Sequence, residues 1–210
     1  MCSIIGSFSK DKFKELVILN QKRGLFSYSF LVLDPETLLT VSLTQGFGGF
    51  DISEIDKAPN NMFYLGHTQA PTGGLIKDYS RIHPAQIDNM FLFHNGIIKQ
   101  KDVKRLQQKY MTNNGWDSML MLEDINSNTL IHTLNTIDGS FACVFNDTET
   151  FSIFRSAAGT LFIDDYLNIS SVFFNGSERI KKDTIYTVKF KEKLILESET
   201  FKSKSNPYFY

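Results

Sequence analysis

The stretch that decides the fold is the N-terminal run Met1-Cys2-Ser3-Ile4-Ile5-Gly6-Ser7-Phe8. Its apolar, β-branched residues predict a strand over 2–8. A cysteine at position 2 is small enough for ordinary removal of the initiator methionine, which would leave a thiol and a free α-amino group on one residue. An α-amine titrates near pH ~8 and a thiol near ~8.5, so Cys2 could serve as both nucleophile and base. One cysteine has no specificity by itself, and the alternative is that position 2 is simply variable.

The composition predicts a single globular domain over residues 1–210. The chain of 210 residues is 42% hydrophobic, which is enough for a sizeable core. A formal net charge of -1 provides no global basic field for nucleic acid or a membrane surface. There is no signal-peptide layout and no apolar run near the ~18 residues of a membrane span, and two cysteines make no disulfide framework. We therefore expect a cytoplasmic protein that binds neither nucleic acid nor membranes.

Short strand patterns alternate with a few helical patterns along the chain. Beyond the first strand, the sequence predicts strands over 26–33, 38–43, 62–68 and 89–97 and a succession of strands over 140–201. The predicted helices cover 10–22, capped by Ser9, 101–110, and 127–134, capped by Ser127, with a fourth starting at Gly115-Trp116. A glycine-rich break is predicted at 46–49. The connection over 69–88 is long enough to indicate a functional loop.

Several segments, in the same order over most of the chain, resemble the class II glutamine amidotransferases. Cys2-Ser-Ile-Ile-Gly6 is similar to the opening of that family, Arg23-Gly-Leu-Phe-Ser to its Arg-Gly-x-Asp-Ser segment, and Gly-His67-Thr68-Gln69 to its Gly-His-Thr-Arg segment. Phe-His-Asn95-Gly96 resembles its Asn-Gly strand end. The resemblance implies an α+β fold of the N-terminal-nucleophile (Ntn) hydrolase type, a four-layer αββα sandwich of two antiparallel sheets flanked by helices. No synthase domain follows, so the glutaminase-type domain would stand alone.

The resemblance also implies a catalytic apparatus. Cys2 would attack a glutamine-type amide and form a thioester, while the side-chain amide of Asn95 and the backbone N–H of Gly96 would bind the oxyanion. Losing one such donor typically costs about 2.7–4 kcal/mol of transition-state stabilisation. For Asn95-Gly96 taken alone, the alternative is a type I′ turn, which is the commonest meaning of that dipeptide.

The substrate-binding residues implied by the resemblance are Arg23, His67, Thr68, Gln69, Thr72 and Asn128. Gln69 stands where the family has an arginine for the α-carboxylate, and Asn128 aligns with its aspartate for the α-ammonium, although a slipped alignment would select Asp124. Because both replacements are neutral, we predict weak hydrolysis of free L-glutamine and better hydrolysis of an amide whose α-groups are blocked. The alternative is that a charged residue reaches in from elsewhere, namely Arg81, Arg155, Lys77 or Asp124.

No metal or cofactor is expected. The spacings of His67, His83 and His94 match no compact ligand motif, so we predict partly buried, hydrogen-bonded histidines at strand ends. Cys143 is predicted to be a small core residue. The predicted function is release of ammonia from glutamine or a related small-molecule amide, for use by a separate synthetase or ligase. Two alternatives are a non-catalytic binding or regulatory module of the same fold, and an Ntn hydrolase that acts on another amide.

Overall fold

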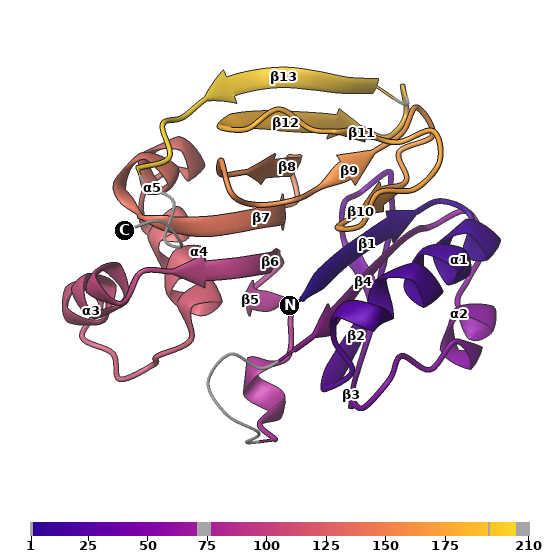
Figure 1. Cartoon of the computed structure of the whole chain (residues 1–210), viewed down its shortest axis with the longest axis horizontal. Coiled ribbons are helices and arrows are strands. Elements are labelled where there is room, and N and C mark those ends of the chain that lie inside the picture. The colour runs from indigo at the N-terminus through magenta and orange to yellow at the C-terminus, as the bar shows by residue number, and fades with distance from the viewer. Residues whose placement is uncertain (1, 71–76, 193, 205–210) are drawn as a thin grey trace.

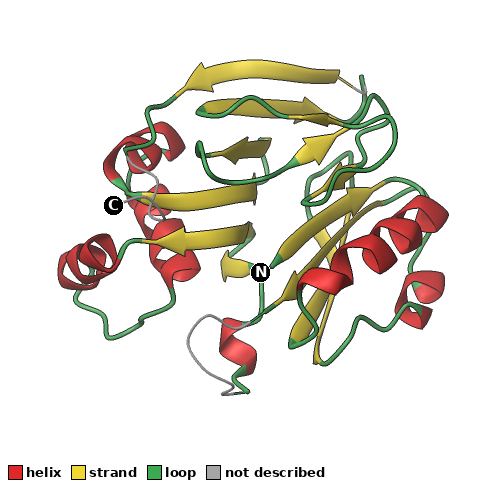
Figure 2. Cartoon of the chain, in the orientation of Figure 1, coloured by secondary structure: helices red, strands yellow, loops and turns green. Residues whose placement is uncertain are grey.

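Two antiparallel sheets face each other in the computed structural model, which describes residues 2–70, 77–192 and 194–204 (Figure 1). In this part of the chain the first sheet has the strand order β11-β9-β10-β1-β4-β2-β3, and the second has the order β13-β12-β8-β7-β6-β5. Helices flank both sheets on their outer sides (Figure 2). The fold is therefore an α+β sandwich of two antiparallel sheets flanked by helices, as the resemblance implied.

The first sheet consists of β1 (Ser3–Ser7), β2 (Ser27–Leu33), β3 (Thr40–Phe47), β4 (Phe63–Gln69), β9 (Phe162–Ile163), β10 (Ile169–Ser170) and β11 (Glu178–Arg179). The second consists of β5 (Ala85–Ile87), β6 (Met90–Ile98), β7 (Gly139–Asn146), β8 (Phe151–Arg155), β12 (Thr184–Lys189) and β13 (Leu194–Thr200). The helices are α1 (Lys10–Asn20), α2 (Ser53–Lys57), α3 (Gln100–Lys109), α4 (Asp117–Ser127) and α5 (Leu130–Thr136), with short 3-10 turns at Gln21–Arg23 and Tyr79–Arg81.

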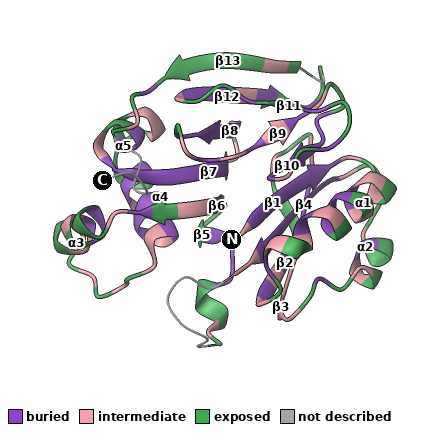
Figure 3. Ribbon diagram, viewed as in Figure 1, coloured by how far each residue is buried: buried purple, intermediate pink, exposed green. Residues whose placement is uncertain are grey.

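The strand β1 lies in the interior of its sheet and is buried along its whole length (Figure 3). Because successive side chains of a strand point to opposite faces, Ile4 enters the core between the sheets and Ile5 enters the core beneath α1. Because both faces of β1 are buried, apolar and polar residues do not alternate along it. The helix α1 begins as predicted, with the Ser9 hydroxyl accepting a hydrogen bond from the Lys12 N–H at 3.2 Å.

Two local predictions differ from the structure, and one short helix was missed. Ser127 ends α4 rather than capping the next helix, because the buried face of α4 continues to Ile125 and Thr129 caps α5 instead. The predicted break at 46–49 begins too early, since Gly46 pairs with Tyr28 inside the β2–β3 ladder and Gly48 is the residue with a positive φ of 102°. The short helix α2 was not predicted. No helix in the described ranges has both the length and the apolar character that crossing a bilayer needs.

Candidate active site

Cys2 directly precedes β1, where the two sheets diverge and β1 approaches β6 (Figure 1). Its thiol is half-buried and lies 3.6 Å from the carbonyl oxygen of Ala70. The Arg23 guanidinium donates a hydrogen bond from Nε to the carbonyl of Cys2 at 3.1 Å. Burial raises the pKa of the Cys2 thiol, the negative charge of Asp117 raises it further, and Arg23 opposes the change. The thiol is therefore protonated at neutral pH, and a nucleophilic role requires a base to remove its proton.

Asn95 and Gly96 lie inside β6 rather than in a turn, which excludes the type I′ alternative. The ladder to β7 pairs Asn95 with Ala142 and Gly96 with Phe141. In the same register the Lys99 N–H donates to Asp138 at 2.8 Å, and bonded pairs alternate along an antiparallel ladder, so the N–H of Gly96 points away from β7. A Cβ atom at Gly96 would lie 1.9 Å from the Ser140 carbonyl oxygen. Only glycine fits this position.

Ser171, which directly follows β10, connects β6 with the strand that carries the nucleophile. Its hydroxyl accepts a hydrogen bond from the Ile4 N–H at 2.9 Å and another from Asn95 Nδ2 at 3.2 Å. Ile4 is two residues from Cys2 in the sequence. One hydroxyl therefore links Asn95 on β6 to β1, the strand that directly follows Cys2 in the other sheet.

Asp117 is a residue of this site that the sequence argument missed. It is the first residue of α4, and its Oδ2 accepts a hydrogen bond from the Ile98 N–H at 3.1 Å, just beyond Gly96 on β6. Its charge acts on the thiol of Cys2, as noted above. A usable signal was present, because an acidic residue at the predicted helix start after Trp116 is typical of a first helical turn.

Asn128 lies at the opposite end of the same helix. The 11 residues of α4 span about 16 Å, so the C-terminal cap is far from Asp117 at the start of the helix. Asn128 donates from Nδ2 to the Asp124 carbonyl at 3.0 Å. Asp124 is fully buried and accepts hydrogen bonds from Lys109 at 2.7 Å, Tyr110 at 2.6 Å and Thr133 at 2.9 Å. The structure thus places neither Asn128 nor Asp124 beside Cys2.

The remaining predicted substrate-binding residues surround the end of β4. β4 pairs with β1 so that Ser3 lies opposite Thr68 and Ile4 opposite His67. Gln69 is the last residue of β4, and its Oε1 accepts a hydrogen bond from the Ser27 hydroxyl at 2.8 Å, which leaves its Nε2 as a neutral donor. Thr72 lies outside the described residues.

The three histidines are more deeply buried than predicted. His67, His83 and His94 are exposed by 0%, 4% and 2%, and the ring centroids of His67 and His83 are 4.0 Å apart. Within the described part of the chain, neither ring nitrogen of His67 has a hydrogen-bond partner, whereas His94 Nδ1 lies 3.0 Å from Ser118 Oγ. Burial lowers the pKa of His67 to about 3. No group of three or more potential ligands among the described residues is arranged to hold a metal ion.

The charged residues considered as alternative anchors have other partners. Arg155 is buried and donates to backbone carbonyls, including that of Ile180 at 2.7 Å. Arg81 pairs with Asp78 at 3.5 Å, and the Lys77 ammonium lies over the ring of Phe47, 5.6 Å from its centre. Cys143 is fully buried in the core under α4, as predicted.

Comparisons with known proteins support the fold. No protein-family model and no curated protein matches the sequence. Among solved structures, the chain is similar to glutamine phosphoribosylpyrophosphate amidotransferase from B. subtilis, bound to ADP and GMP, with a TM-score of 0.67 and 14% sequence identity. It is also similar to a structure described as the allosteric regulatory enzyme of purine biosynthesis, with a TM-score of 0.68 and 14% identity. Both alignments cover 97% of this chain and 50% of the other, so this chain spans about half the length of those proteins.

Proposed function

We propose that this protein hydrolyses the side-chain amide of glutamine or of a closely related small molecule and releases ammonia, with Cys2 as the nucleophile. The observation that carries the proposal is the hydrogen-bonded link, through Ser171, between Asn95 and the strand that follows Cys2. Asn95 is bound by the same hydroxyl that binds the strand of Cys2, and the Gly96 N–H points away from its ladder partner. Amide hydrolysis through a thioester requires a nucleophile, donors for the oxyanion and a base for the thiol proton.

Because the pKa of the Cys2 thiol is raised, its attack needs a general base, and we assign that role to the N-terminal amine. After removal of Met1, the α-amine of Cys2 would titrate near pH ~8 and take the thiol proton as the sulfur attacks the amide carbonyl. The oxyanion would accept hydrogen bonds from Asn95 and Gly96. The protonated amine would then return its proton to the leaving nitrogen, which departs as ammonia, and water would hydrolyse the thioester. No metal or organic cofactor takes part in this proposal.

The substrate preference follows from Asp117 and Gln69. The carboxylate of Asp117 can bind an α-ammonium group, which supplies the anchor that the sequence argument had sought at Asn128. Gln69 offers a neutral donor, which binds an α-carboxylate about half as strongly as a charged one. We therefore propose that the preferred substrate has a free amine and a blocked α-carboxylate. The released ammonia would serve a separate cytoplasmic synthetase or ligase.

The proposal is tested by covalent labelling with a glutamine-like diazoketone. Cys2 should react, and intact mass should show that Met1 is absent from the labelled protein. Cys143 provides an internal control, because it is 0% exposed and burial raises the pKa of its thiol well above the usual value. Cys2→Ala should abolish both labelling and ammonia release, while Cys143→Ala should leave both unchanged. Equal labelling of the two cysteines, or full activity in protein that retains Met1, would contradict the proposal.

A further inference from the structure

The hydroxyl of Ser171 joins the strand that follows the proposed nucleophile to the proposed oxyanion donor through two hydrogen bonds. Ser171 is 1% exposed, and its oxygen accepts from the Ile4 N–H at 2.9 Å and from Asn95 Nδ2 at 3.2 Å. We infer that Ser171 is a positioning residue for catalysis, which fixes the amide of Asn95 relative to Cys2. The inference rests on the proposed function, since it assigns Ser171 a role in that same reaction.

Asn95 depends on this contact for its orientation. Ser171 is the hydrogen-bond partner that the described residues provide for the side chain of Asn95. The side chain is half-buried and would otherwise be free to change rotamer. An oxyanion donor must lie within hydrogen-bond distance of an oxygen that becomes negative only in the transition state, and a displacement of about 1 Å can cost about 100-fold in rate. Loss of the Ser171 hydroxyl should therefore lower turnover more than substrate binding.

The backbone of Ser171 is itself fixed to β1, so its hydroxyl forms a defined reference point. Its N–H donates to the Ile4 carbonyl at 3.0 Å, and its own carbonyl accepts from Thr160 Oγ1 at 3.3 Å and from Arg23 Nη1 at 3.5 Å. Arg23 also donates to the carbonyl of Cys2. Ser171 is thus connected to the nucleophile segment through both its backbone and Arg23, and to Asn95 through its hydroxyl alone.

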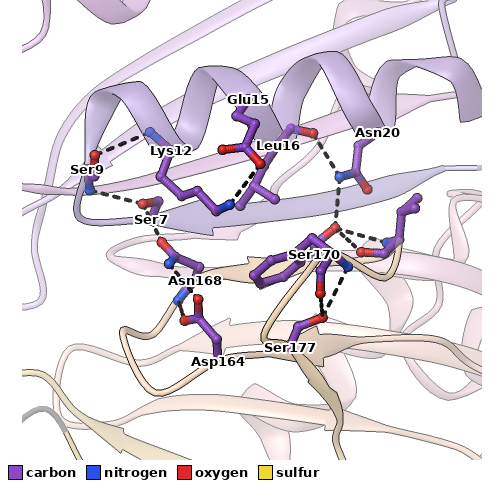
Figure 4. A network of polar contacts seen from close by, with 12 residues as sticks. Ser7, Ser9, Lys12, Glu15, Leu16, Asn20, Asp164, Asn168, Ser170 and Ser177 are labelled. Atoms are coloured by element: carbon purple, nitrogen blue, oxygen red, sulfur yellow. Dashed lines mark hydrogen bonds and ion pairs between the residues drawn. The ribbon is translucent and has the colours of Figure 1, made fainter.

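The preceding residue offers a matched control. Ser170 is also fully buried, and its hydroxyl accepts from Asn20 Nδ2 at 2.8 Å, in a network that links β10 to α1 (Figure 4). It also donates to the Val172 carbonyl at 2.6 Å. None of the hydrogen bonds of its side chain reaches Asn95. Ser170→Ala therefore removes a buried serine hydroxyl of equal size without changing the proposed oxyanion site.

The test is a double-mutant cycle of Ser171→Ala, Asn95→Ala and the variant that carries both substitutions. Ser170→Ala is the control. For each variant, kcat and KM for ammonia release and the melting temperature are measured. Ser171→Ala should lower kcat about tenfold with little change in KM, which corresponds to one lost neutral hydrogen bond in the transition state. In the Asn95→Ala background it should cause no further loss of kcat. It should still lower the melting temperature there, because Ile4 loses its acceptor in both backgrounds. Ser170→Ala should lower only the melting temperature.

The inference would be overturned if Ser171→Ala lowered kcat by the same factor in the wild type and in Asn95→Ala, because a purely structural residue acts whether or not Asn95 is present. A wild-type kcat in Ser171→Ala would overturn it as well. These results differ from failure of the proposed function, which would appear as undiminished ammonia release in Cys2→Ala.

Discussion

Replacing Asn95 by alanine separates a catalytic role from a folding role. The side chain is half-buried, and the described residues offer it one neutral hydrogen bond, 3.2 Å from Ser171. Loss of that bond should lower the free energy of unfolding by only about 0.5–1.5 kcal/mol. Loss of an oxyanion donor should raise the activation free energy by about 2.7–4 kcal/mol, a decrease of ~100-fold or more in kcat.

The assay measures ammonia release by coupled enzymatic detection, together with thermal unfolding of the same samples. Asn168→Ala is a suitable control, since the side chain of Asn168 bonds to Ser7 at 2.6 Å and Asp164 at 2.8 Å within the fold. It should affect stability and leave kcat unchanged. If Asn95→Ala instead unfolds the protein while each folded molecule keeps normal activity, Asn95 is a structural residue and the oxyanion argument is wrong.

Three further predictions concern stability, pH and substrate choice. Gly96→Ala should destabilise the fold by about 3 kcal/mol or more in thermal melts, because the new Cβ would lie 1.9 Å from a backbone oxygen. Gly115→Ala is the control and should cost little, since the nearest atom to its Cβ would be 3.9 Å away. Equal melting temperatures for the two variants would contradict the packing at β6. The pKa of His67 is about 3 in the folded state and ~6.5 in the unfolded state. Between about pH 3 and pH ~6.5 the unfolded state therefore binds more protons than the folded state. The free energy of unfolding should fall as the pH falls through this range, by up to about 1.4 kcal/mol per pH unit. His67→Gln should flatten this dependence of the free energy of unfolding on pH, whereas His132→Gln, at an exposed position, should not. An unchanged pH dependence in His67→Gln would refute a buried, neutral His67. Gln69→Arg should lower KM for free L-glutamine while Asn128→Asp leaves it unchanged, and a sub-millimolar KM already present in the wild type would exclude the altered preference.

Much of the fold could be predicted because local pattern and tertiary context agree. The apolar run of β1 predicts a buried strand, and Ser9 caps α1 where the sequence places a cap. The prediction failed at Ser127, because the serine that looks like a cap is the last residue of the preceding helix, whose buried face reaches Ile125. Capping propensity is a weak signal where the preceding helix extends as far as the candidate cap.

The site was predicted only where its residues lie in short distinctive segments. Cys2, Asn95 and Gly96 belong to such segments, and in the structure Ser171 bonds both to Asn95 and to the strand that follows Cys2. Asp117 reaches the site because the start of α4 bonds to Ile98 after both have folded onto the same sheet. Its position depends on long-range packing, which spacing along the chain does not encode. For the same reason, spacing along the chain did not show that Asn128 and Asp117 lie at opposite ends of α4.

The buried carboxylate of Asp124 has a consequence for motion. It bonds to Lys109 at the end of α3, to Tyr110 just beyond it and to Thr133 on α5, so one residue of α4 ties three helices together. We expect these helices to exchange their amide hydrogens as one cooperative unit rather than to fray separately. Because Asp117 begins the same α4, opening of that unit would carry the negative charge away from Cys2. The helical layer would then set how often the site is assembled, on the slow timescale of local unfolding.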